Sequence, residues 1–584
     1  MTSNRQTLLS LRRFAALATM SAVLAACGGG GGDPVATPAP GTPVAGTPTP
    51  TPTPTPDNTP GTLVTGVLVG PVGTQVLLQN NSADPLSVTV APDAAAPTDN
   101  YAQKAFSFVA KLLDGATYSV SVANAPADQT CMPFAGETGT MPVAARKVWV
   151  GCEFKYDHLV RSSNDAVVGG FSGSQSPMLG GSNVPIGATT VAYGEGRAAV
   201  FVSSIAGIAG GNTAAFRQVF WRDRLTGETV LVSATAAGAQ GNGDSFLPVV
   251  SADGVTVAFE SSASNLVAGD TNAVSDIFVW SALNRTAGVQ RVSVGLAGAQ
   301  TNATSNKPSL SGDGKVVAFT SGATNLTVGE NGGINAIRVY RRDLMAGVNT
   351  LISQNESGVS QEGNHPVLSE DGNRLAFSTF APLRTTDANN LWDIYVYQHI
   401  PADIQRVSLT STGGERNQGT ESASRSVAPA ISGDGQYVAY ATTATNMVPD
   451  ASVGLQHVFV VNVTTGSVVR ASVSSTGTQG NADSPVGNGE RPSLSADGRW
   501  VAFTTAATNI AGTTSVVLRN WETNETRAVT NASYEPAGVG PVSLTRTGAY
   551  VAFWNSTPLD SKFSVAGLFA HFTGLQRAFT WFEN

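Results

Sequence analysis

The sequence has 584 residues, of which 63 are glycine and 31 are proline, while only 13% are charged. The formal net charge is −8, and no cluster of lysine and arginine follows the first fifteen residues, which argues against phosphate-backbone binding and so against a nucleic-acid partner. Few Lys and Glu with abundant Val, Thr and Gly favour short strands joined by tight turns, so we expect an all-β protein.

Residues 1–26 have the pattern of a secretory signal peptide, with three arginines before an apolar run that is too short to span a bilayer. The run ends in Leu24-Ala25-Ala26-Cys27, which resembles the lipobox of bacterial lipoproteins. That resemblance implies that Cys27 is lipidated, becomes the mature N terminus and anchors the protein in a membrane. By the family's sorting rule, Gly28 favours the outer membrane. The alternative is an ordinary signal peptide with a chance cysteine.

Residues 27–61 are predicted to be a disordered stalk rich in glycine, proline and threonine. Five glycines are followed by a Pro/Thr tract, with unbroken Thr-Pro alternation from Thr47 to Pro56. Such a tract buries no core and favours polyproline II, at about 3.1 Å per residue and on the order of 100 Å in all. We expect it to lift the folded part from the membrane. A linker without a spacing role is the alternative.

Residues 62–154 contain short apolar strands separated by Gly, Pro, Asn and Asp, which predicts a small β-sandwich domain. The unit resembles a module of bacterial surface lipoproteins through Leu78–Asn81, Asp114–Val120, Gln129–Cys131 and Val150–Cys152. That resemblance implies a spacer or presentation domain.

The chain has three cysteines, and if Cys27 carries lipid, Cys131 and Cys152 remain as a pair. An exported protein meets an oxidising compartment, so we expect a Cys131–Cys152 disulfide. Two free buried thiols are the alternative.

The rest of the chain, residues 155–584, repeats. Its strongest phrase is Ser-x-Asp-Gly-x-x-Val-Ala-Phe, as in Ser251–Phe259 and Ser311–Phe319. Exact, close and degenerate copies recur roughly every 60 residues, which indicates a repeat architecture. Their anchoring glycines are Gly196, Gly254, Gly314, Gly372, Gly435, Gly498 and Gly548.

Each repeat holds four strand signals, with Asp-Gly supplying the tight turn between the first and second. Third strands are expected at Asp276–Trp280, Asp393–Tyr397 and His457–Val461. Such units bury both faces only by stacking, and radial stacking closes the array, so the sequence predicts a seven-bladed β-propeller. A linear solenoid is the alternative.

The repeat is similar to the TolB-like, PD40 (WD40-like) propeller family over roughly residues 180–584. That resemblance implies the fold, whereas function varies among propellers. In the seventh repeat, Val565–Phe572 and Gln576–Thr580 are expected as the last two strands. Residues 155–180 are a further candidate to add a strand to that repeat.

Two loops carry an Asp-x-Asn-x-x-x-Asp pattern that spaces oxygen ligands as the start of a calcium loop does. The candidate metal ligands are Asp270, Asn272, Asp276, Asp387, Asn389 and Asp393. The distal glutamate of a full calcium loop is absent. The alternative interpretation is that these residues cap turns through side-chain hydrogen bonds.

A second recurrent phrase carries polar amides between repeats, as in Gln240-Gly241-Asn242, Gln300-Thr301-Asn302 and Gln479-Gly480-Asn481. We expect these amides to satisfy backbone groups in the crossover to the next repeat. A repeated binding rim is the alternative.

The sequence has no Gly-x-Ser-x-Gly elbow, His-Glu-x-x-His helix or Walker loop. No two of its five histidines are close in the chain, so a catalytic histidine would require a site assembled across repeats. His457 stands where other repeats have the Asp that opens the third strand. The histidines are His158, His365, His399, His457 and His571.

These observations favour a non-catalytic binding or scaffold module of the cell envelope, with protein or glycan partners, a lipid anchor and no cofactor other than possible calcium. An extracellular polymer-processing enzyme is the second hypothesis, either a glycan lyase or hydrolase or a peptidase-associated propeller. A purely structural role in the surface coat is the third.

Overall fold

The structure of the chain is a computed structural model. It describes residues 61–94, 101–141, 147–154, 156–158, 190–192, 198–204, 206–213, 215–224, 226–328, 333–417, 428–450, 454–485, 491–512, 515–530, 542–555 and 567–572. The predicted signal peptide, Cys27 and the predicted stalk as far as residue 60 lie outside these residues.

The described residues form an all-β structure, as predicted. They contain nine four-stranded sheets, two 3-10 turns (Arg285–Ala287 and Leu296–Gly298) and one short helix, α2 (Thr508–Ala511). Among them, no helix has the length and apolar character needed to cross a bilayer.

Two sheets precede the repeats and are called here the N-terminal sheet pair. The first has the order β4-β1-β8-β6, and the second has the order β3-β2-β5-β7. The strands are β1 (Thr62–Pro71), β2 (Gln75–Asn80), β3 (Asp84–Thr89), β4 (Tyr101–Leu112), β5 (Thr117–Asn124), β6 (Gln129–Ala135), β7 (Thr138–Thr140) and β8 (Val148–Phe154).

The sheet pair shares one hydrophobic core. Leu68 and Phe106 of the first sheet pack in the same cluster as Leu78 and Tyr118 of the second. In β5, buried Tyr118 and Val120 alternate with exposed neighbours, as the sequence alternation predicted.

Seven sheets, called repeat sheets 1 to 7, follow the Asp-Gly repeats of the sequence. Sheet 1 contains β10 (Thr190–Ala192), β11 (Ala198–Ser203), β12 (Gln218–Asp223) and β13 (Thr229–Leu231). Sheet 2 contains β14 (Ser245–Val250), β15 (Thr256–Ser261), β16 (Asp276–Ser281) and β17 (Gln290–Arg291). Sheet 3 contains β18 (Ser305–Leu310), β19 (Val316–Ser321), β20 (Arg338–Asp343) and β21 (Val348–Leu351).

The later sheets keep this plan. Sheet 4 contains β22 (Asn364–Leu368), β23 (Arg374–Thr379), β24 (Asp393–Gln398) and β25 (Asp403–Arg406). Sheet 5 contains β26 (Ala430–Ile431), β27 (Tyr437–Thr442), β28 (His457–Asn462) and β29 (Val468–Arg470). Sheet 6 contains β30 (Ser493–Leu494), β31 (Trp500–Thr505), β32 (Ser515–Asn520) and β33 (Glu525–Ala528).

The Asp-Gly phrase forms the turn between the first and second strand of a sheet. In sheet 3, Ser311 Oγ donates to Asp313 Oδ1 at 2.7 Å and accepts from the Val316 amide at 3.0 Å. Gly314 adopts a φ of 70°, which a residue with a side chain rarely adopts. The phrase therefore fixes hairpin geometry, and the strand that follows, Val316–Ser321, is buried throughout.

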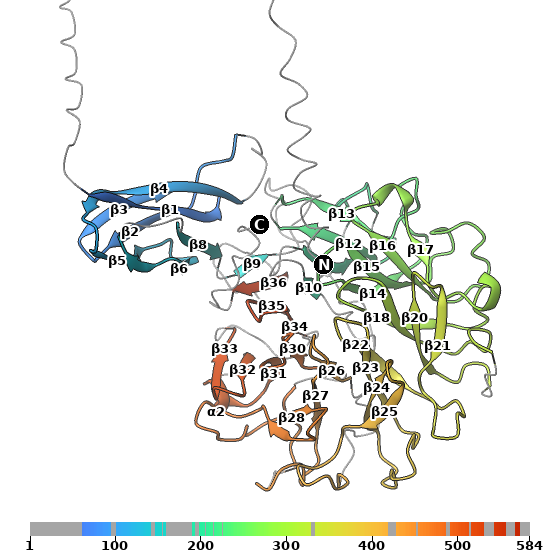
Figure 1. Cartoon of the computed structure of the whole chain (residues 1–584). Coiled ribbons are helices and arrows are strands. Elements are labelled where there is room, and N and C mark those ends of the chain that lie inside the picture. Colours follow the sequence, from blue (N-terminus) through green and yellow to red (C-terminus); the bar gives the residue numbers. More distant parts are fainter. Residues whose placement is uncertain are drawn as a thin grey trace, which may run out of the picture. The chain divides into compact units, whose positions relative to one another are not determined.

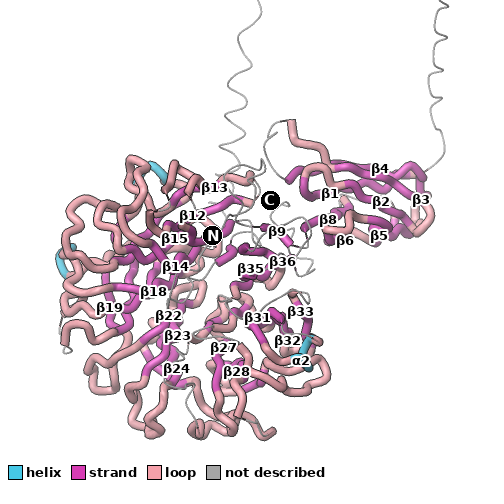
Figure 2. Tube along the Cα trace, turned by 180° about the vertical axis from the view of Figure 1, so that it is seen from behind, coloured by secondary structure: helices cyan, strands magenta, loops and turns pink. Residues whose placement is uncertain are grey.

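The first strands of the repeat sheets contact one another in sequence order. Each first strand from β10 to β30 contacts the first strand of the next sheet, and β34 (Ser543–Leu544) of sheet 7 contacts β10 of sheet 1. Figure 1 labels all of these first strands, and Figure 2 shows the sheets from the opposite side. The repeat sheets therefore follow one another in a closed cycle.

Sheet 7 is completed by a strand that precedes the first repeat. Its order is β34-β35-β36-β9, with β35 (Tyr550–Asn555), β36 (Gly567–Phe572) and β9 (Tyr156–His158). His158 pairs with Phe569 in antiparallel register. The expected contribution of residues 155–180 to this repeat is confirmed, as is a strand within Val565–Phe572. The strand expected at Gln576–Thr580 lies outside the described residues.

A buried carboxylate joins the N-terminal sheet pair to both ends of the repeat. Glu153 of β8 accepts a hydrogen bond from the hydroxyl of Tyr550 at 2.6 Å and another from the hydroxyl of Tyr101. Arg224 Nη2 lies 3.6 Å from Glu153 Oε1, and its guanidinium stacks over the ring of Tyr550. All four residues are buried, so these contacts fix the sheet pair against sheets 1 and 7.

Candidate functional site

Three consecutive first strands depart from extended geometry at the same position. Leu247, Lys307 and His365 each precede a proline and have φ values of 48°, 55° and 50°. Left-handed backbone is rare in residues with side chains and is not the conformation that a following proline favours. The ladder of each strand shifts register at this place. Such bulges redirect a side chain out of the regular ladder.

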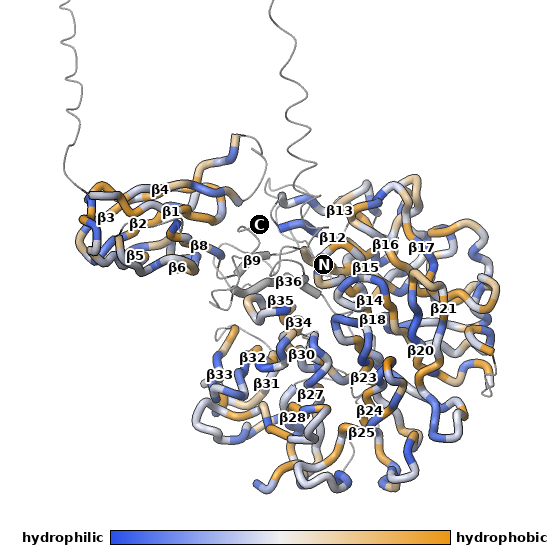
Figure 3. Tube along the Cα trace, in the orientation of Figure 1, coloured by the Kyte–Doolittle hydropathy of each residue, from blue (hydrophilic) through white to orange (hydrophobic). Residues whose placement is uncertain are grey.

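Lys307 links three repeat sheets. Its Nζ donates to Asn364 Oδ1 of sheet 4 at 2.8 Å and lies 3.1 Å from His365 Nε2. Its backbone amide donates to Glu260 Oε2 of sheet 2 at 3.3 Å. In Figure 3, β18, which carries Lys307, includes a hydrophilic stretch. Glu260, Lys307, His365 and Arg491 are called here the inner cluster.

His365 is a neutral member of the inner cluster. Burial and the positive charges of Lys307 and Arg491 hold the pKa of His365 well below its usual value. Its Nε2 can then accept a hydrogen bond from Lys307, while its Nδ1 lies 3.3 Å from Ser378 Oγ and carries the proton toward it. His365 therefore orients Lys307 without adding charge.

Arg491 stands two residues before β30, and no described carboxylate pairs with its guanidinium. Burial lowers the pKa of Arg491, and no carboxylate offsets this effect. Among the described residues, no hydrogen bond or ion pair to its guanidinium is present. The Arg491 side chain is half-buried, so its guanidinium keeps some contact with solvent.

Glu260 and Lys307 both titrate near neutral pH. Burial raises the pKa of Glu260 to about 7, although the backbone amide and charge of Lys307 and a hydrogen bond from Ser275 oppose the shift. Burial lowers the pKa of Lys307 to about 8 despite the attraction of Glu260. Ionisable groups whose pKa values are shifted in this way occur at functional sites more often than elsewhere.

The Asp-Gly turns of the repeat sheets are joined by backbone hydrogen bonds from one sheet to the next. The bonds run from Ala252 N to Gly312 O, Gly312 N to Glu370 O, Glu370 N to Gly433 O, Asp434 N to Ala496 O, and Ala496 N to Arg546 O, at 2.7 to 3.0 Å. The turns of sheets 4 and 5 approach closely, because a Cβ added to Gly433 would lie only 2.6 Å from Glu370 Cδ. Lys307 precedes Gly312 by five residues along the chain. The inner cluster and these turns therefore lie at different levels of the first strands.

The first predicted metal site contains an arginine. Arg291 Nη1 lies 3.2 Å from both Asp270 Oδ1 and Asp276 Oδ2, and Asn272 Nδ2 donates to Asp276 Oδ2 at 3.0 Å. Asp276 Oδ1 also accepts hydrogen bonds from hydroxyl groups of Ser293 and Thr301. The guanidinium supplies the positive charge that calcium would bring.

The second predicted metal site repeats this arrangement. Arg406 Nη1 lies 2.6 Å from Asp387 Oδ1 and 3.6 Å from Asp393 Oδ2. Arg416 Nη2 lies 2.9 Å from Asp393 Oδ1. Asn389 Oδ1 accepts from the Leu391 amide at 2.9 Å, which is the predicted capping role.

Within the described residues, no group of three or more His, Cys, Asp or Glu side chains is arranged to hold a metal ion. The aspartates of both loops are paired with arginines, and Asn389 caps a turn. Calcium binding at these residues nevertheless stays a prediction that a titration must test.

The recurrent amides between repeats satisfy backbone groups, as expected. Asn265 Oδ1 accepts from the Asn242 amide at 2.9 Å, and Asn265 Nδ2 donates to Gln240 O at 3.0 Å. The same contacts recur for Asn302 with Asn325 and for Asn481 with Asn509. In these three crossovers the asparagines thus have structural partners.

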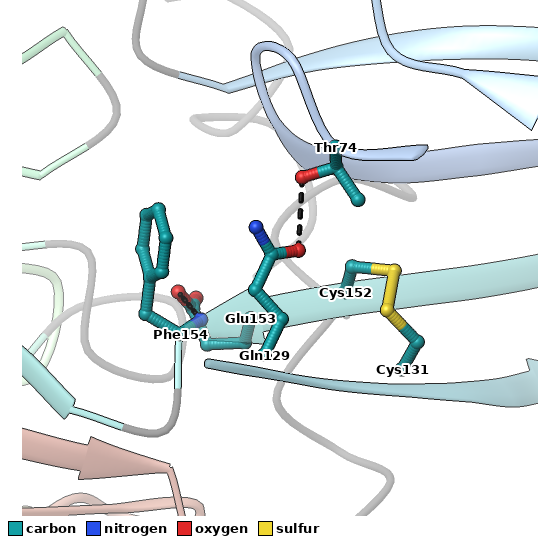
Figure 4. Close-up of a disulfide and its surroundings, with 6 residues drawn as sticks. All are labelled: Thr74, Gln129, Cys131, Cys152, Glu153 and Phe154. Carbon is teal, nitrogen blue, oxygen red and sulfur yellow. Dashed lines mark hydrogen bonds between the residues drawn. A yellow bond between two sulfur atoms is a disulfide. The ribbon is translucent and has the colours of Figure 1, made fainter. Parts of the chain in front are cut away.

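The predicted Cys131–Cys152 disulfide is present and joins β6 to β8 (Figure 4). Beside it, Thr74 Oγ1 donates to Gln129 Oε1 at 2.9 Å. Glu153, the residue that contacts sheets 1 and 7, follows Cys152 directly. The disulfide therefore holds β8, the strand that carries Glu153, covalently to β6.

His457 replaces an aspartate, as predicted. Asp276 and Asp393 open third strands and bind the hydroxyl groups of Ser293 and Ser408, and His457 Nδ1 lies 2.9 Å from Ser472 Oγ at the equivalent position. Burial lowers the pKa of His457 to about 4. His457 is thus a neutral structural residue at neutral pH.

Sequence reasoning did not identify the inner cluster. A signal was present, because Leu247-Pro248, Lys307-Pro308, His365-Pro366 and Arg491-Pro492 each stand at one spacing before a Ser-x-Asp-Gly phrase. Aligning the repeats on that phrase places Lys307, His365 and Arg491 in a single column. Glu260 has no such signal, since it occupies a different strand.

No protein-family model matches the sequence, and no curated protein matches it. Solved structures similar to it include TolB proteins and other β-propeller proteins. TolB from Acinetobacter baumannii is 18% identical with a TM-score of 0.30, over 53% of this chain and 61% of its own. The match thus spans less than two thirds of that TolB.

Two further solved structures are also similar to this chain. An oligogalacturonate lyase from Vibrio parahaemolyticus is 10% identical with a TM-score of 0.42, over 78% of this chain and 98% of its own. The β-propeller domain of the Trilobed protease from Pyrococcus furiosus is 10% identical with a TM-score of 0.37. The match covers 65% of this chain and 93% of that domain.

Proposed function

We propose that this protein is a non-catalytic binding module of the cell envelope, built as a seven-bladed β-propeller (155–584) behind a small β-sandwich (62–154). The closed cycle of first-strand contacts and the completion of sheet 7 by β9 support the propeller. The shared core of the N-terminal sheet pair supports the sandwich.

The observation that carries a binding role is that Lys307, His365 and Arg491 occupy the same position in three repeats. Among the described residues, the guanidinium of Arg491 has no counter-ion. Lys307 and His365 meet across two repeats, and the charge of Arg491 acts on His365 from a third. Binding of a protein or glycan partner would supply the missing negative charge. In this proposal the inner cluster is the contact site for that partner.

The proposal includes export and anchoring through Cys27, with residues 1–26 removed and residues 27–61 acting as the stalk. The Cys131–Cys152 disulfide supports an oxidising compartment. Labelling with radioactive palmitate in a bacterial host should mark the wild-type chain and should not mark Cys27→Ser. Labelling of both proteins would contradict the anchor.

The binding role is tested by affinity capture from envelope extracts with the full-length protein. We expect a partner that wild type retains and that Lys307→Met/Arg491→Met loses. The matched control is Lys315→Met/Arg499→Met, because Lys315 and Arg499 are well exposed and pair with Asp313 and Glu522. Equal recovery by both variants would contradict the inner cluster as the contact site.

A second candidate function is processing of an extracellular polymer. Glu260 and Lys307 favour it, because their pKa values of about 7 and 8 suit a general base and a general acid near neutral pH. Turnover of a glycan or peptide that Glu260→Gln abolishes would select the enzyme. Binding that survives Glu260→Gln without turnover would select the module.

A further inference from the structure

The contact between repeat sheets 1 and 7, called here the seam, is held by two strands of the N-terminal sheet pair. Glu153 of β8 accepts a hydrogen bond from Tyr550 of sheet 7 at 2.6 Å and lies 3.6 Å from Arg224, which follows β12 of sheet 1. Met132 and Phe134 of β6 pack against the buried cluster that contains Tyr550. Both β6 and β8 therefore contact the seam, one through apolar side chains and the other through a carboxylate.

The seam has little apolar packing of its own. In the core cluster that sheet 1 shares with sheet 7, which includes Phe201 and Phe220, the described residues of sheet 7 contribute only Ala552. Sheets 2 and 3, in contrast, share a cluster that takes large side chains from both, such as Ile277 and Tyr340. Because the free energy of burial grows with the apolar area that is buried, the contacts supplied by the sheet pair matter at the seam.

Strand β6 depends on a single neighbouring strand. It is outermost in the order β4-β1-β8-β6, so β8 is its only strand partner in that sheet among the described residues. Pro133 has no amide proton to donate to the ladder, and the register of β6 with β8 shifts between Pro133 and Ala135. The backbone ladder therefore holds β6 weakly at the place where Met132 and Phe134 reach the seam.

The Cys131–Cys152 disulfide joins β6 and β8 beside their seam contacts. Cys131 directly precedes Met132 in β6, and Cys152 directly precedes Glu153 in β8. Cys152 is buried, whereas Cys131 is half-buried, so a small reductant can approach the bond from the side of Cys131. The disulfide is thus the covalent link between the apolar contact and the carboxylate contact of the seam.

We propose that this disulfide is a redox-sensitive control on closure of the repeat cycle. When it is formed, β6 and β8 hold sheets 1 and 7 together, and when it is reduced, the seam opens more often. A dithiol breaks the S–S bond, each sulfur gains one electron and one proton to become a thiol, and the dithiol is oxidised to its own disulfide. The expected response is local, because folded proteins open in separate units with separate free energies.

Hydrogen–deuterium exchange of the full-length protein, measured by mass spectrometry with and without dithiothreitol, tests the proposal. After reduction, we expect exchange to be at least about tenfold faster in Ala198–Ser203 of sheet 1 and Tyr550–Asn555 of sheet 7. Exchange in Val316–Ser321 of sheet 3 and Arg374–Thr379 of sheet 4 should not change, since these strands are not part of the seam. An unchanged seam, or an equal rise in all seven sheets, would overturn the proposal.

The double variant Cys131→Ala/Cys152→Ala shows whether the effect of dithiothreitol comes from this bond. Its seam should exchange as fast as that of reduced wild type, and dithiothreitol should have no further effect. Seam exchange as slow as that of oxidised wild type would contradict control by the disulfide.

A second variant keeps the disulfide and removes the apolar seam contact, which separates loss of contact from loss of folding. Met132 and Phe134 lie outside the buried core of the sheet pair. Met132→Ser/Phe134→Ser should therefore leave exchange in β5 unchanged and speed exchange at the seam without reductant. The matched control is Val109→Ser/Leu113→Ser, because both side chains are well exposed on the same sheet pair. Equal seam exchange in the two variants would reject the proposal, even if reduction unfolds the sheet pair.

Discussion

Arg546 and Glu370 join the Asp-Gly turns of two repeat sheets that are not neighbours. Arg546 Nε of sheet 7 lies 2.9 and 2.8 Å from the two carboxylate oxygens of Glu370 in sheet 4. The pair spans the same turns that backbone hydrogen bonds link in sequence. One end of the cycle of first strands is thus bridged by an ion pair between distant repeats.

We expect Arg546→Ala to lower the free energy of unfolding by no more than about 1 kcal/mol, because the arginine side chain is 57% exposed. Urea denaturation measures the change. The control is Arg499→Ala, whose partner Glu522 lies in the same sheet. A loss of more than about 2 kcal/mol would show that the ion pair, and not the backbone bonds, holds the turns together.

Glu153→Leu should destabilise the protein by about 3 to 5 kcal/mol, because it leaves Arg224 buried without its carboxylate. Tyr550→Phe should cost less, about 1 to 3 kcal/mol, since it removes a hydroxyl that bonds Glu153 and Arg224 but leaves their ion pair in place. Thermal and urea denaturation measure both changes. The double variant Glu153→Leu/Arg224→Met should be more stable than Glu153→Leu alone. If it is not, the guanidinium does not depend on Glu153.

Glu260→Gln should stabilise the protein at pH 8 by up to about 3 kcal/mol and should have little effect at pH 4. The pKa of Glu260 is about 7 in the folded state and lower in the unfolded state, so the folded state binds more protons between these values. Stability from this residue is therefore lost as the pH rises from about 4.5 to 7. Urea denaturation at both pH values measures the difference. Equal effects at both would contradict the raised pKa.

Calcium should raise the melting temperature of Arg291→Gln more than that of wild type. The substitution removes the guanidinium between Asp270 and Asp276 and leaves the oxygen ligands in place. Differential scanning calorimetry with millimolar calcium, and with magnesium as the control, measures the shift. A wild-type shift as large as that of the variant would show that Arg291 does not compete for the site.

Local signals predicted most of the fold. The Asp-Gly turn is formed by contacts between residues that are close in the chain, such as Ser311, Asp313 and Gly314. Its geometry therefore follows from the local sequence. The third strands that open at Asp276, Asp393 and His457 were predicted for the same reason. Completion of sheet 7 by Tyr156–His158 was only partly foreseen, since that pairing joins opposite ends of the repeat.

The candidate site was not predictable in the same way. Lys307, His365 and Arg491 are ordinary polar residues in their own segments, and only the cyclic arrangement of sheets brings them together. For the aspartates predicted as metal ligands, the pattern was visible in the sequence but the binding partners were not. Their spacing is local and visible, whereas the arginines that pair with them come from the next strand or the next crossover.

The pairing of His158 with Phe569 has a consequence for the order in which the sheets assemble. The strand that completes sheet 7 is synthesised before any repeat, yet its partner is made after all the other sheets. A growing chain therefore carries an open series of repeats with exposed strand edges until its last repeat has been made. The closing step cannot begin earlier, whatever the stability of the individual sheets.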